Sequence, residues 1–185
     1  MKRKFGISLI LAALALAGCS EKQASAEKER RQMFQIDSVD ARTGVQRMQM
    51  SKHRSVVTCG KEKLDLEIVR RPDEKLPVVH SSNGNFMDNS IGLLLKKEGR
   101  VLVNRVFTKK DFTRLLPYKG LEHFMLEGLV FDDISTREKK ELTFSASISY
   151  PQSDLYIPFR IVVSQQGKVN IHQDESMGEF SLPTE

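Results

Sequence analysis

Alternation of apolar and polar side chains over two neighbouring stretches constrains the fold of this chain more than any other feature. In residues 142–150 the apolar positions are Leu142, Phe144, Ala146, Ile148 and Tyr150, and the positions between them are Thr143, Ser145, Ser147 and Ser149. In residues 156–163 the apolar positions are Ile157, Phe159, Ile161 and Val163. Because successive side chains of a strand point to opposite faces, each stretch predicts a strand with one buried and one solvated face. Such half-buried strands favour antiparallel pairing.

The same pattern, together with the turns between its segments, predicts two antiparallel hairpins. Residues 91–95 and 101–107 flank the polar turn 96–100, and the strand at 156–163 is followed by the turn 164–168 and a short returning strand. We also expect strands at 64–68 and 122–131, a loop at 81–85 and a polar turn at 132–140.

One short helix is expected near residues 109–116. Thr108 stands three residues before Asp111, a variant of the capping box that satisfies free amide groups at a helix start. The apolar stripe of this helix consists of Phe112, Leu115 and Leu116, and Pro117 follows it. The chain is therefore expected to be mainly β, an antiparallel meander of about eight strands that forms a sandwich or partial barrel, with this helix across it.

The amino-terminal residues have the order of a secretory signal. Three cations at positions 2–4 precede an apolar run over residues 5–18. This run is too short for a membrane-spanning helix, which needs about 20 apolar residues. The sequence Leu16-Ala17-Gly18-Cys19 resembles a bacterial lipobox. The resemblance implies that residues 1–18 are a removable lipoprotein signal peptide and that Cys19 carries a lipid anchor.

The composition after Cys19 predicts a tether followed by one domain. Residues 19–33 are polar and too poor in large apolar side chains to order themselves, so they are expected to be a flexible tether. Residues 34–185 are long enough for a single β-rich domain with its own core. If Cys19 is lipidated, Cys59 is the only thiol left, which excludes an intrachain disulfide. The apolar, β-branched surroundings of Cys59 favour a buried structural role over a reactive one.

The positive charge of the chain resides largely in the predicted signal. The formal net charge of +5 becomes +2 when residues 1–18 are removed, because they contain three cations and no Asp or Glu. The alkaline composition is therefore not the footprint of nucleic-acid binding.

One local excess of cations remains between residues 96 and 119. Its members are Lys96, Lys97, Arg100, Arg105, Lys109, Lys110, Arg114 and Lys119, against Glu98 and Asp111. They predict contact with an anionic lipid surface or an acidic partner, each cation near such a surface contributing about 1 kcal/mol. The alternative is a solvated hairpin turn followed by the exposed side of a short helix.

No motif for catalysis, metal binding or a cofactor is found. The four histidines, His53, His80, His123 and His172, have none of the spacings of metal ligands. A nucleophile elbow and a glycine-rich phosphate loop are also missing. Asn83-Gly84-Asn85 with Asp88 lacks the terminal Glu of a calcium loop and is interpreted as a turn. The hydroxyl row at 143–149 is interpreted as the solvated side of a sheet rather than as a glycan groove.

Two short motifs carry a resemblance to a known family. They are Phe107-Thr108-Lys109-Lys110-Asp111-Phe112, and Leu142-x-Phe144 leading to Tyr150-Pro151-Gln152-Ser153-Asp154. Residues 60–175 resemble a domain-of-unknown-function family of small Bacteroidetes-type lipoproteins. The resemblance implies a compact β-rich domain on a lipid anchor and offers no catalytic residues. Because Ser20-Glu21-Lys22 has no acidic run for surface export, we expect an outer-membrane location facing the periplasm.

The expected function is that of a membrane-anchored envelope lipoprotein, a non-enzymatic module that binds a partner protein or ligand. The first alternative is a carrier that encloses a small apolar ligand in a curved sheet, and the second is a hydrolase. An enclosed apolar pocket would favour the carrier, and a cleft with converging titratable groups would favour the enzyme.

Overall fold

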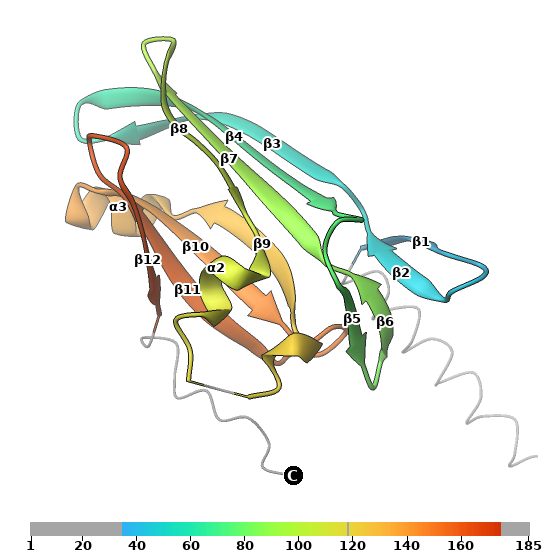
Figure 1. Ribbon diagram of the computed structural model, residues 1–185. Coiled ribbons are helices and arrows are strands. Elements are labelled where there is room, and N and C mark those ends of the chain that lie inside the picture. The colour runs from blue at the N-terminus through green and yellow to red at the C-terminus, as the bar shows by residue number, and fades with distance from the viewer. Residues whose placement is uncertain (1–34, 118, 175–185) are drawn as a thin grey trace, which may run out of the picture.

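Four antiparallel strands form the first sheet of the protein. The computed structural model describes residues 35–117 and 119–174. The first sheet has the order β3-β4-β7-β8 and consists of β3 (Ser51–Cys59), β4 (Glu62–Pro72), β7 (Asn89–Lys97) and β8 (Arg100–Phe107) (Figure 1). The predicted hairpin around residues 96–100 is confirmed as β7–β8.

The second sheet lies face to face with the first and completes a sandwich. It has the order β12-β11-β10-β9 and consists of β9 (Met125–Phe131), β10 (Leu142–Ser149), β11 (Tyr156–Val163) and β12 (Val169–Gln173). The two alternating stretches of the sequence are β10 and β11, paired antiparallel from Leu142 opposite Val163 to Ser149 opposite Tyr156. The β-rich fold class is thus confirmed.

The core between the two sheets is made by the predicted inward positions. The buried side chains from β10 and β11 are Leu142, Phe144, Ala146, Ile148, Ile157, Phe159, Ile161 and Val163. They face the buried rows Leu64, Leu66 and Ile68 of β4 and Ile91, Leu93 and Leu95 of β7. Since each strand contributes every second residue, the two sheets meet through one continuous apolar layer.

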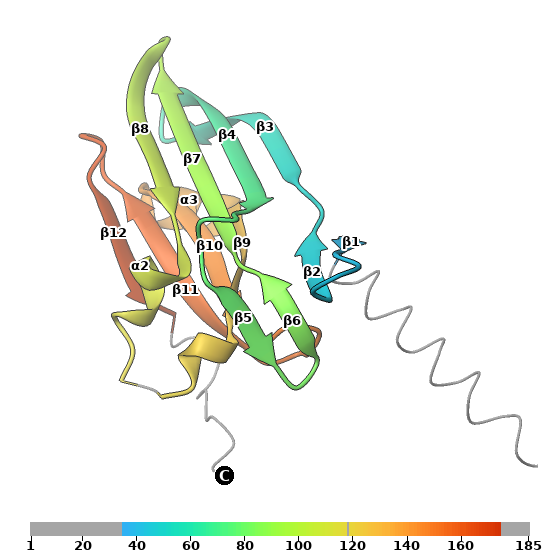
Figure 2. The same ribbon diagram turned by 45° about the vertical axis from the view of Figure 1, so that its right-hand side comes forward.

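A third, smaller sheet lies at the end of the sandwich where β4 ends and β7 begins (Figure 2). It has the order β1-β2-β6-β5 and consists of β1 (Ile36–Val39), β2 (Val45–Met48), β5 (Val78–Ser81) and β6 (Gly84–Met87). A second buried cluster joins Met48, Val79 and Phe86 of this sheet to Met125 of β9. Strands β2 and β6 pair in parallel, which a simple antiparallel meander does not contain. The loop expected at 81–85 is shorter than predicted, because a two-residue turn at 82–83 joins β5 and β6 and the flanking residues already pair as strands.

The predicted helix is present but shorter than expected. Helix α2 spans Lys109–Thr113 and begins with the predicted capping box, in which the Asp111 Oδ2 accepts the backbone N–H of Thr108 at 2.9 Å. Of the expected apolar stripe, only Phe112 is fully buried, with its ring centroid 5.0 Å from that of Phe159. Leu115 is 45% exposed, because the chain leaves the helix before that residue can face the core.

The segment around the start of β9 and the following link also differ from expectation. A 3-10 turn, η1 (Leu121–His123), precedes β9, so the strand expected from residue 122 begins at Met125. Residues expected as a polar turn form helix α3 (Asp133–Lys139), with the Asp132 carboxylate accepting the N–H of Ser135 at 2.9 Å. The N-cap Asp132 and the cations of the last turn are helix signals that the polar composition concealed.

Candidate interaction surface

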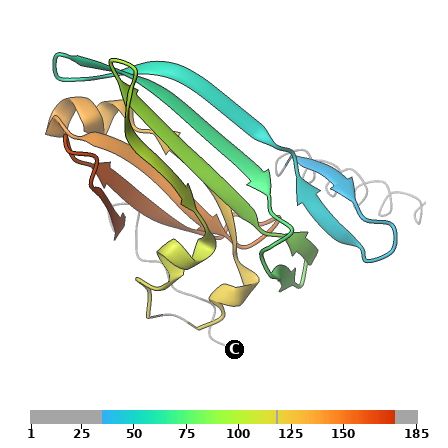
Figure 3. The same cartoon turned by 45° about the horizontal axis from the view of Figure 1, so that its top comes forward.

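The outer face of the first sheet is the side turned away from the second sheet. Among the described residues no other element covers it, and it has a mixed apolar and charged pattern. The strand registers place its side chains in three rows across β3, β4, β7 and β8. These rows are Val56–Asp65–Lys96–Val101, Arg54–Glu67–Leu94–Asn104 and Lys52–Val69–Gly92–Val106. Figure 3 tilts this side of the first sheet toward the viewer, and none of the described helices crosses it there.

Three valines of the outer face are unusually exposed. Val56 is 64%, Val101 58% and Val106 56% exposed, and Leu94 is half-buried beside them. A group of exposed apolar side chains on one face, surrounded by charges, is typical of a surface that binds another molecule. A single exposed valine would need no such explanation.

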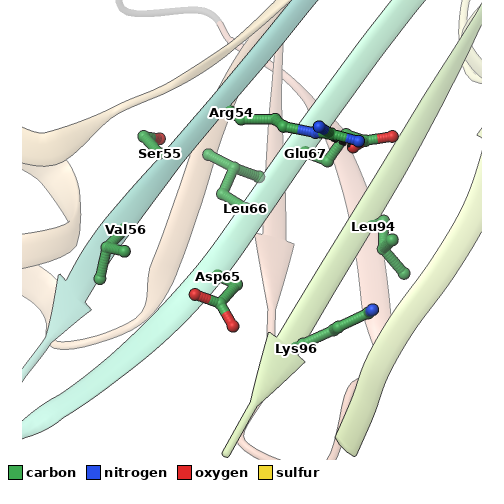
Figure 4. A pocket seen from close by; sticks show the side chains of 8 residues that line it. All are labelled: Arg54, Ser55, Val56, Asp65, Leu66, Glu67, Leu94 and Lys96. Atoms are coloured by element: carbon green, nitrogen blue, oxygen red, sulfur yellow. Dashed lines mark hydrogen bonds and ion pairs between the residues drawn. The ribbon is translucent and has the colours of Figure 1, made fainter. Parts of the chain in front are cut away.

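A shallow hollow of about 440 Å³ lies on this face between β3 and β7 (Figure 4). Its lining includes Val56 and Leu94, the carboxylates of Asp65 and Glu67, and the cationic side chain of Lys96. The hollow therefore offers apolar side chains, carboxylates and a cation to a bound molecule. These groups come from neighbouring strands, which are spaced about 4.8 Å apart.

Some charged side chains of the outer face form ion pairs with one another and others do not. The Glu67 carboxylate accepts a hydrogen bond from Arg54 Nε and lies 3.3 Å from Lys52 Nζ. The bond from Arg54, with help from Lys52, lowers the pKa of Glu67. Lys96 stands opposite Asp65 in the register, but within the described residues neither forms an ion pair inside 4.0 Å. Lys96 is therefore available to a carboxylate from outside.

A second hollow, of about 550 Å³, opens at the end of the sandwich formed by the β3–β4, α3–β10 and β11–β12 turns. Cys59 lines it, and the structure leaves this residue half-buried rather than fully buried as expected. Burial, with the nearby carboxylates of Glu62 and Glu141, raises the pKa of the Cys59 thiol. The environment therefore disfavours the reactive thiolate form.

The predicted cation cluster is dispersed by the fold. Lys96, Lys97 and Arg100 lie at the tip of the β7–β8 hairpin, whereas the members from Lys109 onward lie beyond the other end of β8 (Figure 1). Since β8 has eight residues, about 26 Å of strand separates the two groups.

Several of the cluster's cations have internal partners. Lys97 pairs with Glu62, and Arg105 lies 3.0 Å from Asp111 and stacks 4.8 Å from the centroid of the Phe107 ring. Arg114 Nη2 is 3.7 Å from the same Asp111 carboxylate. Lys109 pairs inward with Asp88, whereas Lys110 and Lys119 are exposed.

The first resemblance motif forms a joint between the sandwich and the third sheet. Lys109 Nζ lies 3.5 Å from the buried carboxylate of Asp88 and donates to the carbonyl oxygens of Glu122 and Phe124. The other carboxylate oxygen of Asp88 accepts the N–H groups of Asn89 and Leu126, both at 2.9 Å. Burial raises the pKa of Asp88 and lowers the pKa of Lys109.

The second resemblance motif forms another joint. Tyr150 Oη forms a hydrogen bond with the Ser82 hydroxyl at 3.0 Å and accepts the backbone N–H of Ser82 at 2.9 Å, and these two bonds lower the pKa of Tyr150. Asn83 Nδ2 donates to the carbonyl oxygen of Pro151 at 2.7 Å, and Gln152 Nε2 donates to Gln46 Oε1 at 2.9 Å. Lys109 of the first motif and residues 150–152 of the second therefore fasten the third sheet, whereas Leu142 and Phe144 of the second motif lie in the core between the two large sheets.

The hydroxyl row of β10 is only partly solvated, contrary to expectation. Thr143 and Ser149 are buried, and Ser145 and Ser147 are half-buried. Thr143 lies beside α3, where its N–H donates to Thr136 Oγ1 at 3.0 Å. The Ser149 hydroxyl donates to the carboxylate of Glu127. Neighbouring elements thus cover both ends of the row.

The histidines do not converge. His53 contacts Ser55 on β3, His80 contacts Asn85 across the β5–β6 hairpin, and His172 is exposed on β12. His123 Nδ1 lies 2.6 Å from the carbonyl oxygen of His80. Within residues 35–117 and 119–174, no three His, Cys, Asp or Glu side chains gather as a metal site requires. In the same residues, no helix is long and apolar enough to cross a bilayer.

The exposed valines of the outer face were not singled out from the sequence, although a signal exists. Three stretches place apolar residues at adjacent positions, and therefore on both faces of their strand: Val56-Val57, Val101-Leu102-Val103 and Val106-Phe107. Since one of two adjacent residues in such a strand faces the core, the other must face outward. Adjacent apolar residues in a strand with one buried side are therefore a sequence mark of an outward apolar surface.

A comparison with known families gives one match, which covers most of the chain. The family model described as Domain of unknown function (DUF4738) matches residues 29–171. The match begins within the predicted tether and includes both resemblance motifs. No curated protein matches the chain. The three-sheet fold, its two joints and its uncovered sheet face are therefore those of a chain that belongs to the DUF4738 family.

Proposed function

We propose that this protein is a lipid-anchored envelope lipoprotein that binds a partner protein through the outer face of its first sheet, without catalysing a reaction. The anchor is Cys19, which lies outside the described residues, and the proposed location is the periplasmic face of the outer membrane. The observation that carries the binding role is the group of exposed valines on the outer face, one of which, Val56, lines the 440 Å³ hollow. Burying such side chains against a partner would gain about 25 cal/mol per Å² of apolar area.

The position at which the chain enters the folded domain supports an anchor at one end and a binding surface at the other. The first described strand, β1, is an edge strand of the third sheet, remote from the tip of the β7–β8 hairpin (Figures 1 and 2). A lipid at Cys19, followed by the tether, would hold the protein from the β1 end. The far end of the first sheet is then free to meet a partner in the aqueous compartment.

The structure favours partner binding over the carrier alternative. The core residues between the sheets are at most 7% exposed, so the interior is filled by the protein's own side chains. The floor of the 550 Å³ hollow contains Leu64, Leu142 and Val163, each at most 4% exposed, and its rim is charged. Polar and charged side chains therefore make up much of the wall, and this hollow is not the enclosed apolar pocket that a carrier needs.

Site-specific photo-crosslinking in living cells tests the binding role. A photoreactive amino acid would replace Val56 or Val106 on the outer face, and Val130 of β9 as the matched control, which is 61% exposed on the other sheet. We expect one discrete protein adduct from the first two positions and none from position 130. Equal labelling at all three positions, or no adduct at 56 and 106, would contradict the proposed surface.

Mass spectrometry of the protein isolated from its own cells tests the anchor separately. The expected amino terminus is a lipid-modified Cys19. An uncut chain, or a free thiol at position 19, would refute the anchor while leaving the crosslinking result intact.

A further inference from the structure

The outer face carries more positive than negative charge. Its side chains, taken from the alternate positions of β3, β4 and β7, include the cations Lys52, Arg54, Lys63, Arg71 and Lys96. The carboxylates on the same face are Asp65 and Glu67. Because like charges repel across an interface, this excess disfavours a second copy of the chain stacked face to face and favours an acidic partner.

The arrangement within the first row shows what such a partner must offer. Val56, Asp65, Lys96 and Val101 follow one another across four neighbouring strands, so the two exposed valines lie about 14 Å apart. An extended segment lying across the strands would meet an apolar group at each end and the unpaired ammonium of Lys96 between them. The hollow beside Lys96 has a volume within the about 300–1,000 Å³ range of ligand pockets.

We propose that the outer face binds an acidic, extended protein segment that places a carboxylate on Lys96 and large apolar side chains on Val56 and Val101. This inference rests on the proposed function and names the partner's chemistry. An anionic bilayer fits the face less well, because it would press uniform negative charge onto the carboxylates of Asp65 and Glu67. A protein segment can instead match the alternation of signs.

Gly92 provides a variant that blocks the face without entering the core. It lies on the outer face between Val69 and Val106, and an added Cβ would meet nothing closer than the carbonyl oxygen of Val69 at 3.9 Å. Gly92→Tyr therefore adds a ring to the docking surface, and tyrosine suits a strand better than glycine does. Its fold is checked by a thermal melt followed by circular dichroism.

The test measures binding of a fluorescent glutamate–tyrosine copolymer to the anchored chain in phosphatidylcholine nanodiscs. Polyglutamate is the charge-only probe, and vesicles of phosphatidylglycerol are the lipid probe. The variants are Lys96→Glu and Gly92→Tyr, with Lys110→Glu as a matched charge reversal on α2. We expect the copolymer to bind, to weaken with added salt, and to lose about tenfold in affinity with Lys96→Glu, which corresponds to about 1.4 kcal/mol. Gly92→Tyr should also weaken binding, and Lys110→Glu should leave it unchanged.

Each other outcome overturns the inference. Polyglutamate binding as tightly as the copolymer would mean that charge alone acts, without the apolar contacts. Retention by phosphatidylglycerol vesicles that Lys96→Glu abolishes would assign the face to the membrane. Absence of copolymer binding would remove the acidic partner class, while adducts at positions 56 and 106 would still uphold the proposed function. Absence of those adducts would remove the proposed function itself, whatever the copolymer does.

Discussion

Replacing Lys109 with methionine is expected to lower the free energy of unfolding by about 3–5 kcal/mol, the cost of breaking a buried ion pair by removing one partner. The side chains of Asp88 and Lys109 are 4% and 17% exposed, so water does little to screen the charge left behind. The substitution keeps the aliphatic stem but removes the ammonium group. The Asp88 carboxylate then loses its counter-charge, and the carbonyl oxygens of Glu122 and Phe124 lose a donor.

A double-mutant cycle separates this pairing from simple loss of packing. The double variant Asp88→Asn with Lys109→Met leaves neither charge buried. Its loss of unfolding free energy should therefore be smaller, by about 1.5–3 kcal/mol, than the sum of the losses in the two single variants. Equilibrium urea unfolding followed by far-ultraviolet circular dichroism measures each variant. Lys110→Met, one residue along α2 and exposed, is the control and should change the stability by less than about 0.5 kcal/mol.

The pH dependence of the same variant gives an independent check. Burial raises the pKa of Asp88, and removing the Lys109 ammonium takes away the attraction that opposes this rise. A carboxyl group whose pKa is raised in the folded state favours folding below its ordinary pKa, and this contribution is lost as the pH increases through the raised value. The destabilisation by Lys109→Met should therefore be smaller near pH 4 than at pH 7. A cost below about 1 kcal/mol at pH 7, or full additivity in the cycle, would refute the ion pair as a joint.

Three further outcomes follow from particular positions. Phe112→Ala should cost about 3–5 kcal/mol in urea unfolding, whereas Leu115→Ala, at a 45% exposed site, should cost less than about 1 kcal/mol; equal costs would contradict the burial of the Phe112 ring. Gly167→Ala should lower the melting temperature more than Gly99→Ala. Both glycines have positive φ, but only a Cβ at position 167 would meet a β8 carbonyl oxygen, at 2.3 Å, and thermal melts of the two variants test this. Cys59 in the folded chain should react with iodoacetamide at pH 8 more slowly than in the urea-unfolded chain, because burial raises the pKa of its thiol; equal rates would contradict this.

The inward faces of the strands could be predicted because strand periodicity is local. The alternation in β10 and β11 selects the side chains that prove to be buried, and the turn residues locate both predicted hairpins. The start of α2 followed from Thr108 and Asp111, which act within one helical turn. Its end did not, because the contact of Phe112 with Phe107 and Phe159 depends on strands that are distant in sequence.

The candidate surface could be predicted only in part. Lys96 was among the expected contacts, but the other cations of that cluster were assumed to act together because they are neighbours in sequence. The length of β8 separates them, and the buried pair with Asp88 removes Lys109 from any surface role. The outer-face rows join residues up to about fifty positions apart, and only the pairing of β3, β4, β7 and β8 places them side by side.

The sequence by itself determined that this protein is β-rich, which side chains of its clearest strands face the core, and where its hairpins turn, because these properties depend on backbone geometry over a few residues. Only the tertiary structure decided that β2 and β6 pair in parallel in a third sheet, that Thr143 and Ser149 are covered, and that three valines are exposed on one sheet face that no other described element covers. These properties depend on which strands pair across long loops, and a period of two residues specifies the face of a strand but not its neighbour.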